Sequence, residues 1–152
     1  MQNITLSAIR SSKFTHLAVP KTIGNAESDW AVSALPDAAL LYGGSAKLDH
    51  AARVPGAGVV LLVIGCGDAI NYRNFAAAAV RASKGVTHLS IDLTGATAEQ
   101  ILLAAEGCLL GSDTPSEYKK PTTELVATEL VVSEQHLGTD IASSLNLASR
   151  IV

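Results

Sequence analysis

The chain of 152 residues has few aromatic side chains, few charges and no excess of basic residues. Aromatic residues make up 4% of the sequence, so a core must be built from alanine and aliphatic residues. Hydrophobic residues make up 48% and charged residues 16%, a balance that excludes an intrinsically disordered chain. The formal net charge is −3, and binding to nucleic acid mainly through phosphate neutralisation needs a basic surface. We therefore expect a folded protein with no nucleic-acid partner.

Long apolar segments are also missing. The longest strongly apolar run, residues 59–64, is far shorter than the ~20 residues that span a bilayer. Residues 1–5 lack the basic start and the apolar stretch of a signal peptide. The sequence therefore predicts a cytoplasmic protein that forms a single domain, residues 1–152, and has no membrane partner.

Cysteine is scarce as well. Cys66 and Cys108 are far apart in the sequence and form no Cys-x-x-Cys pair. In a reducing compartment this usage favours two partly buried free thiols over a disulfide or a redox role.

Strand and helix patterns alternate from residue 59 onward. The predicted strands after that point are 59–64, 86–93 and 125–132, and the predicted helices are 71–84, 97–111 and 139–152. Such alternation predicts a layered α/β/α domain whose sheet is mixed and mostly parallel. Two earlier strands, 4–8 and 16–19, would extend this sheet, and an antiparallel orientation is open for them. Pro20 is expected to stop the second of these strands, and Pro36 to open a short helix over 36–42.

The sequence predicts where the helix over 97–111 begins and ends and which of its faces is apolar. Thr97 with Gln100 three residues later is the pattern of a capping box, and Gly111 is expected to end the helix. The predicted buried face holds Ile101, Leu102, Ala105, Cys108 and Leu109. Leu103 and Leu110 lie on the opposite side. Either they belong to the core of a sheet covered on both faces, which we favour, or they form a subunit contact.

One segment has the position of a binding motif. Gly65, Cys66 and Gly67 follow a buried strand and precede a helix, where open α/β sheets often bind phosphates. The third glycine of the dinucleotide fingerprint is missing, because position 70 is Ile70. A structural turn is the favoured interpretation, and ligand binding by these three residues is the alternative.

Catalytic and metal-binding patterns are not found. The histidines His16, His50, His88 and His136 do not have the spacing of zinc ligands, and an ordinary hydrogen bond or solvent contact is expected for His88. The carboxylates are scattered, and no Gly-x-Ser-x-Gly nucleophile motif is present. From its residues, the chain is predicted to hold no catalytic residue, no metal ligand and no cofactor.

Three stretches of the sequence resemble the N-terminal domain of the leucyl aminopeptidase, or cytosol aminopeptidase, family. The first is the aliphatic strand 60–67 with its glycines, followed by the alanine-rich helix 72–82. The second is the Glu-Gly-x-x-Leu-Gly segment 106–111, followed by Tyr118-Lys119. The third is the stretch 145–152, which is similar to the helix that leads towards the catalytic domain of the family.

This resemblance implies a fold, a role and partners. The family's N-terminal domain resembles a macro domain, and its enzymes remove N-terminal residues from peptides with two divalent metal ions, zinc or manganese. The metal ligands and catalytic residues lie in the C-terminal domain, around an Asn-Thr-Asp-Ala-Glu-Gly-Arg motif that this sequence does not contain. The resemblance therefore implies a non-catalytic domain that supports assembly and covers the active site. Its partners would be that catalytic domain and further copies of the chain, since family members are hexamers.

A second function stays open at this point. A macro-like fold with the glycine segment Gly65, Cys66 and Gly67 could also be a stand-alone module that binds ADP-ribose or a related nucleotide.

Overall fold

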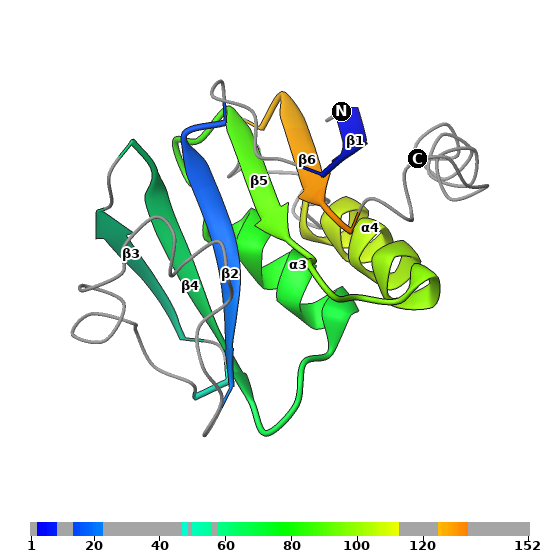
Figure 1. Ribbon diagram of the computed structural model, residues 1–152. Coiled ribbons are helices and arrows are strands. Elements are labelled where there is room, and N and C mark those ends of the chain that lie inside the picture. The colour runs from blue at the N-terminus through cyan, green and yellow to red at the C-terminus, as the bar shows by residue number, and fades with distance from the viewer. Residues whose placement is uncertain are drawn as a thin grey trace, which may run out of the picture.

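In the part of the chain that the structure describes, six strands form one sheet and two helices pack on it (Figure 1). The computed structural model describes residues 3–8, 14–22, 47–48, 50–55, 58–112 and 125–133. Its elements are β1 (Asn3–Ser7), β2 (His16–Thr22), β3 (Ala51–Pro55), β4 (Val60–Gly67), α3 (Tyr72–Arg81), β5 (His88–Asp92), α4 (Ala98–Ser112) and β6 (Ala127–Val131). The helices predicted over 36–42 and 139–152 lie outside the described residues. No described helix is long and apolar enough to cross a membrane.

The sheet is mixed and mostly parallel, as predicted, with the strand order β1-β6-β5-β2-β4-β3. Only β3 runs antiparallel to its neighbour, β4, and every other neighbouring pair is parallel. The antiparallel orientation considered for the two earliest strands is therefore wrong. β2 also lies inside the sheet, between β5 and β4, and does not extend it at an edge.

Pro20 does not end its strand, contrary to the prediction. β2 continues to Thr22, and Pro20 stands opposite Ile64 of β4. Pairing of β2 with β5 covers only His16 to Ala18. Beyond Ala18 one side of β2 therefore needs no ladder hydrogen bonds to β5, and a residue without an N–H group is tolerated there.

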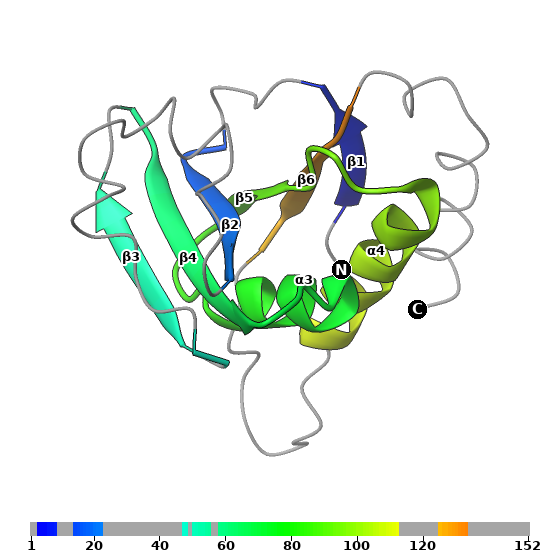
Figure 2. The same cartoon turned by 60° about the horizontal axis from the view of Figure 1, so that its bottom comes forward.

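Both described helices lie on the same face of the sheet (Figure 2). Between helices and sheet lies the larger core cluster, whose bulkiest members include Phe75, Leu62, Ile91, Ile101 and Leu130. Each helix begins at a capping residue that binds an otherwise unpaired backbone N–H. The side chain of Asn71 accepts a hydrogen bond from the amide of Asn74 at 3.1 Å.

The capping box predicted for α4 is confirmed. The amide of Gln100 donates to Oγ1 of Thr97 at 3.2 Å, and the amide of Thr97 donates to Oε1 of Gln100 at 2.8 Å. Two backbone donors at the helix start are satisfied by these reciprocal bonds.

The opposite face of the sheet is apolar on one half and polar on the other. Leu17, Val19, Leu61 and Val63 form a second buried cluster over β2 and β4 with two further valines. Over β5 and β6 this face carries buried polar side chains instead, and Ser90 Oγ donates to Glu129 Oε1 at 3.0 Å. Ser90 and Asp92 of β5 are thus buried although they are polar.

The two helices approach each other very closely along α4. A Cβ atom at Gly107 would lie 2.1 Å from the carbonyl oxygen of Arg73, and one at Gly111 would lie 2.7 Å from the carbonyl oxygen of Ala77. Gly111 is thus a packing residue inside α4, which continues to Ser112, and the prediction that it ends the helix is wrong. At both glycines the missing side chain lets the backbones of α3 and α4 come into contact.

The buried face of α4 is narrower than predicted. Ile101, Ala105, Cys108 and Leu109 are buried, but Leu102 is 38% exposed, so its place on the buried face was predicted wrongly. Ala104 is buried instead, because α3 lies on that side of the helix. Leu110 is 51% exposed, and the favoured expectation that it belongs to the core is also wrong. The two cysteines are free and buried, as expected.

Candidate functional site

The glycine segment is the end of a strand and not a turn. β4 includes Gly65, Cys66 and Gly67, and the chain turns only afterwards, at Asp68. The strand reaches this far because β2 and β3 pair with it on its two sides. The amide of Gly65 donates to the carbonyl oxygen of His50 at 2.8 Å, so it is not available to a phosphate. Nucleotide binding by this segment stays a prediction.

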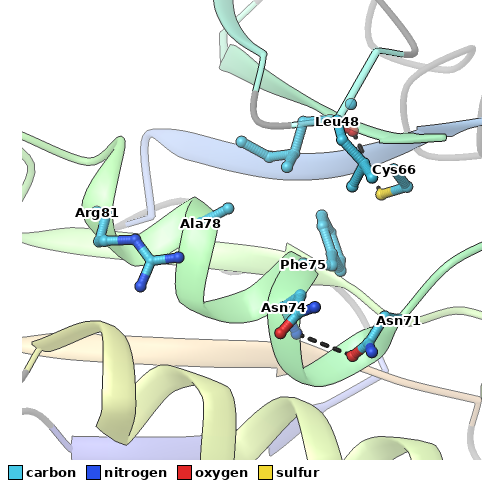
Figure 3. A pocket seen from close by; sticks show the side chains of 9 residues that line it. Leu48, Cys66, Asn71, Asn74, Phe75, Ala78 and Arg81 are labelled. Carbon is cyan, nitrogen blue, oxygen red and sulfur yellow. Dashed lines mark hydrogen bonds between the residues drawn. The ribbon is translucent and has the colours of Figure 1, made fainter.

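A pocket of about 260 Å³ lies beside this strand end, between β4 and α3 (Figure 3). Its walls are apolar and polar in similar measure, and Phe75 points from α3 towards Cys66 and Leu48. Polar side chains come from α3 and its cap. The lining residues are Leu48, Ile64, Gly65, Cys66, Asn71, Asn74, Phe75, Ala78 and Arg81.

A second hollow of about 280 Å³ adjoins the first. It is lined by His50, Ala51, Ala78, Arg81 and Ala82, so Ala78 and Arg81 line both. The two hollows lie next to each other along α3, and we call them together the α3 groove. Its walls come from the exposed side of α3 and from the segment that carries β3 and the end of β4.

Among the described residues that line the α3 groove, Arg81, in the last turn of α3, and His50 can carry a positive charge, and none is a carboxylate. Both residues are exposed. A guanidinium group is always charged and binds carboxylates and phosphates through two parallel hydrogen bonds. The guanidinium of Arg81 can therefore pair with an anion at the groove.

Arg53 connects the two walls of the groove at the C-terminal end of α3. Its Nη2 donates to the carbonyl oxygens of Ala82 at 3.1 Å and of Lys84 at 2.6 Å. These bonds tie edge strand β3 to the end of the helix, where carbonyl groups lack helical partners. The two walls of the groove are thereby held together.

Cys66 is not activated, although it lines the pocket. Burial raises the pKa of its thiol, and a hydrogen bond from the backbone of Lys21 only partly opposes this effect. Its Sγ donates to the carbonyl oxygen of Ile64 at 3.5 Å. Because the thiolate is the nucleophilic form, this thiol is poorly suited to attack a substrate near neutral pH.

Tyr72 lies at the start of α3, near the same end of the sheet. Burial raises the pKa of its hydroxyl, and the negative charges of Asp92 and Cys66 raise it further. Tyr72 therefore stays a neutral hydroxyl and does not act as a base near neutral pH.

The histidines have ordinary local partners. Oγ1 of Thr15 and Nδ1 of His16 are 2.8 Å apart, and burial, aided by the charge of Arg53, lowers the pKa of His16. His88 has the hydrogen bond expected for it, since Nδ1 and Oγ1 of Thr87 are 3.0 Å apart. Its ring also stands edge-on to Phe14, with the ring centroids 5.3 Å apart. His136 lies outside the described residues.

The described residues do not fit the two metal ions that the resemblance implies. Nowhere in this part of the chain do three His, Cys, Asp or Glu side chains come close enough to hold one ion. We therefore derive no step of peptide hydrolysis from the described residues.

Known proteins are similar to this chain over most of its length. No protein-family model matches it. It is 31% identical over 123 residues to a probable cytosol aminopeptidase of Cutibacterium acnes, a match that covers 75% of this chain and 23% of that protein. The predicted resemblance to the cytosol aminopeptidases is confirmed.

The fold agrees with the sequence match. A mutant of tomato leucine aminopeptidase has a TM-score of 0.71 and 16% identity to this chain, and the alignment covers 99% of this chain and 36% of the tomato one. At this identity the likeness shows the fold alone, an α/β fold with a mixed sheet. The chain thus spans 23% of the first aminopeptidase and 36% of the second.

Proposed function

We propose that this chain is the non-catalytic N-terminal domain of a leucyl aminopeptidase, located in the cytoplasm. The observation that carries the proposal is the match along 75% of this chain with only 23% of a cytosol aminopeptidase. A segment of that size can be one domain of the longer enzyme. Removal of N-terminal amino acids from peptides, with two zinc or manganese ions, would then belong to the other domain.

The role of this domain would be assembly and cover of the active site. The exposed side of α4 supports this role, because Leu102 is 38% and Leu110 51% exposed on the helix surface. Exposed leucines on one helix are suited to bury apolar area against another domain or subunit. The proposed partners are the catalytic domain and further copies of the chain.

The coding sequence after Val152 tests this proposal directly. We expect the reading frame to continue into a segment that encodes Asn-Thr-Asp-Ala-Glu-Gly-Arg. A stop codon directly after Val152, with no such segment elsewhere in the same transcript, would contradict the proposal.

The assembly role needs a separate measurement. In the longer enzyme, Leu102→Lys and Leu110→Lys together should reduce the oligomer to smaller species in sedimentation analysis. The control change Ala69→Lys, at an exposed position outside α4, should leave the oligomer intact. An unchanged oligomer in the double leucine variant would contradict the assembly role of α4.

A further inference from the structure

We propose that the α3 groove binds a small organic anion that has an apolar body. The anionic head would bind the guanidinium of Arg81, and the body would lie against Phe75 and Ala78. This inference rests on the geometry of the groove and is independent of the aminopeptidase proposal.

Arg81 is the arginine of α3 that lines the groove. It lines both hollows of the groove and forms no hydrogen bond or ion pair with the described residues. Two other arginines near α3 are already engaged. Arg73 pairs with Glu106 at 3.3 Å, and Arg53 donates to the carbonyl oxygens at the end of the helix. The geometry thus leaves the guanidinium of Arg81 as a donor group at the side of an open depression.

The charge of Arg81 bears on whether the groove binds an anion or a cation. Among the described lining residues neither hollow has a carboxylate, and His50 lines the second one. A cationic ligand would therefore meet Arg81 without a compensating negative charge, whereas a carboxylate or phosphate would pair with it. Asn74 supplies a neutral polar group farther along the first hollow (Figure 3).

The first hollow offers apolar surface against which the body of the ligand can lie. Phe75 and Ile64 are buried core residues whose surfaces form part of its wall, and Ala78 leaves space where a larger side chain would fill it. Its volume is about 260 Å³, larger than the ~150 Å³ of an enclosed apolar cavity that holds benzene, and unlike that cavity it is open and partly polar. A single aromatic ring or a branched aliphatic chain of similar size therefore fits beside the anionic head.

Titration of the chain with three matched probes tests the proposal. The probes are 3-phenylpropionate, phenyl phosphate and the cation 3-phenylpropylamine, measured by calorimetry and by amide NMR shifts. We expect millimolar binding of a carboxylate or phosphate anion and none of the amine, with shifts at Gly65, Asn74 and Ala78. Comparison of the two anions shows which head group is preferred. Equal binding of the amine, or no binding of either anion, would overturn the proposal.

Two substitutions locate the site. Arg81→Gln should weaken anion binding by about threefold to fivefold, the effect of losing an ion pair at an exposed side chain. Arg73→Gln, on the same helix, is the matched control and should bind like the original chain. Ala78→Leu should block both hollows, with the fold checked by circular dichroism and thermal unfolding. Anion binding that survives both Arg81→Gln and Ala78→Leu in folded protein would overturn the proposal.

Discussion

Gly107 of α4 lies directly against the carbonyl group of Arg73 in α3. A Cβ at this glycine would be 2.1 Å from the oxygen and 2.9 Å from the carbon of that group, far inside normal contact distances. The obstacle is backbone, which cannot turn aside as a flexible side chain can. The close helix pair on this face of the sheet therefore depends on the missing side chain.

Gly107→Ala should lower the free energy of unfolding by about 1–2 kcal/mol, since overpacking against backbone lies at the upper end of its typical cost of about 1–3 kcal/mol. Alanine is the better helix former by about 1 kcal/mol, which offsets only part of this cost. Urea unfolding measures the change. Leu110→Ala, at an exposed position of the same helix, is the control and should change stability by only about 0.5 kcal/mol. Equal effects of the two substitutions would refute the close-packing argument.

Thr97→Ala should destabilise the chain by about 1 kcal/mol, because Oγ1 of Thr97 accepts the amide of Gln100 at the start of α4. Thr97→Ser keeps the hydroxyl and should retain most of the stability. The midpoint of thermal unfolding compares the two variants. If serine lowers it as much as alanine does, the hydroxyl does not cap the helix.

Stability should fall at alkaline pH because of Cys108. Complete burial raises the pKa of this thiol to about 12, whereas an unfolded cysteine ionises near pH ~8.5. The folded state therefore holds a proton that the unfolded state releases. This contribution is fully present below pH ~8.5 and is lost at about 1.4 kcal/mol per pH unit towards about pH 12.

Comparison with Cys108→Ala isolates that contribution. The difference in unfolding free energy between the original chain and the variant should shrink by about 2 kcal/mol between about pH 7 and about pH 10. A difference that stays constant over this range would show that Cys108 does not cause the loss.

Arg53→Leu should raise the pKa of His16 towards its ordinary value, because the charge of Arg53 is one cause of its lowering. Burial is the larger cause, so the recovery should be partial. NMR titration of the His16 ring measures this pKa. In Arg53→Lys, which keeps the positive charge, the pKa of His16 should rise less than in Arg53→Leu. No difference between the leucine and lysine variants would exclude a role for the charge.

Most of the fold after residue 58 could be predicted from local patterns. The apolar run of β4, the capping box of α4 and the periodicity of α3 are properties of adjacent residues, and each was read correctly. The errors came from contacts between distant segments. Pairing with β2 extends β4 through Gly65 and Gly67, and packing against α3 places Gly111 inside α4.

The candidate site was less predictable for the same reason. Gly65 and Cys66 were singled out and do line the pocket, but Arg81, Asn74 and Leu48 were not expected beside them. These residues meet only because α3 folds back along β4 and because Leu48 packs near Gly67. The helical spacing of Asn74, Ala78 and Arg81 was the one signal in the sequence that they share a side of α3.

The most direct measurement of the central claim is a peptidase assay of the purified chain. Leucine p-nitroanilide is the substrate, manganese or zinc is added, and a full-length leucyl aminopeptidase serves as the positive control. We predict no turnover above the rate of the metal ion alone. Turnover by this chain at a rate comparable to that of the full-length enzyme would contradict the proposal that catalysis belongs to another domain.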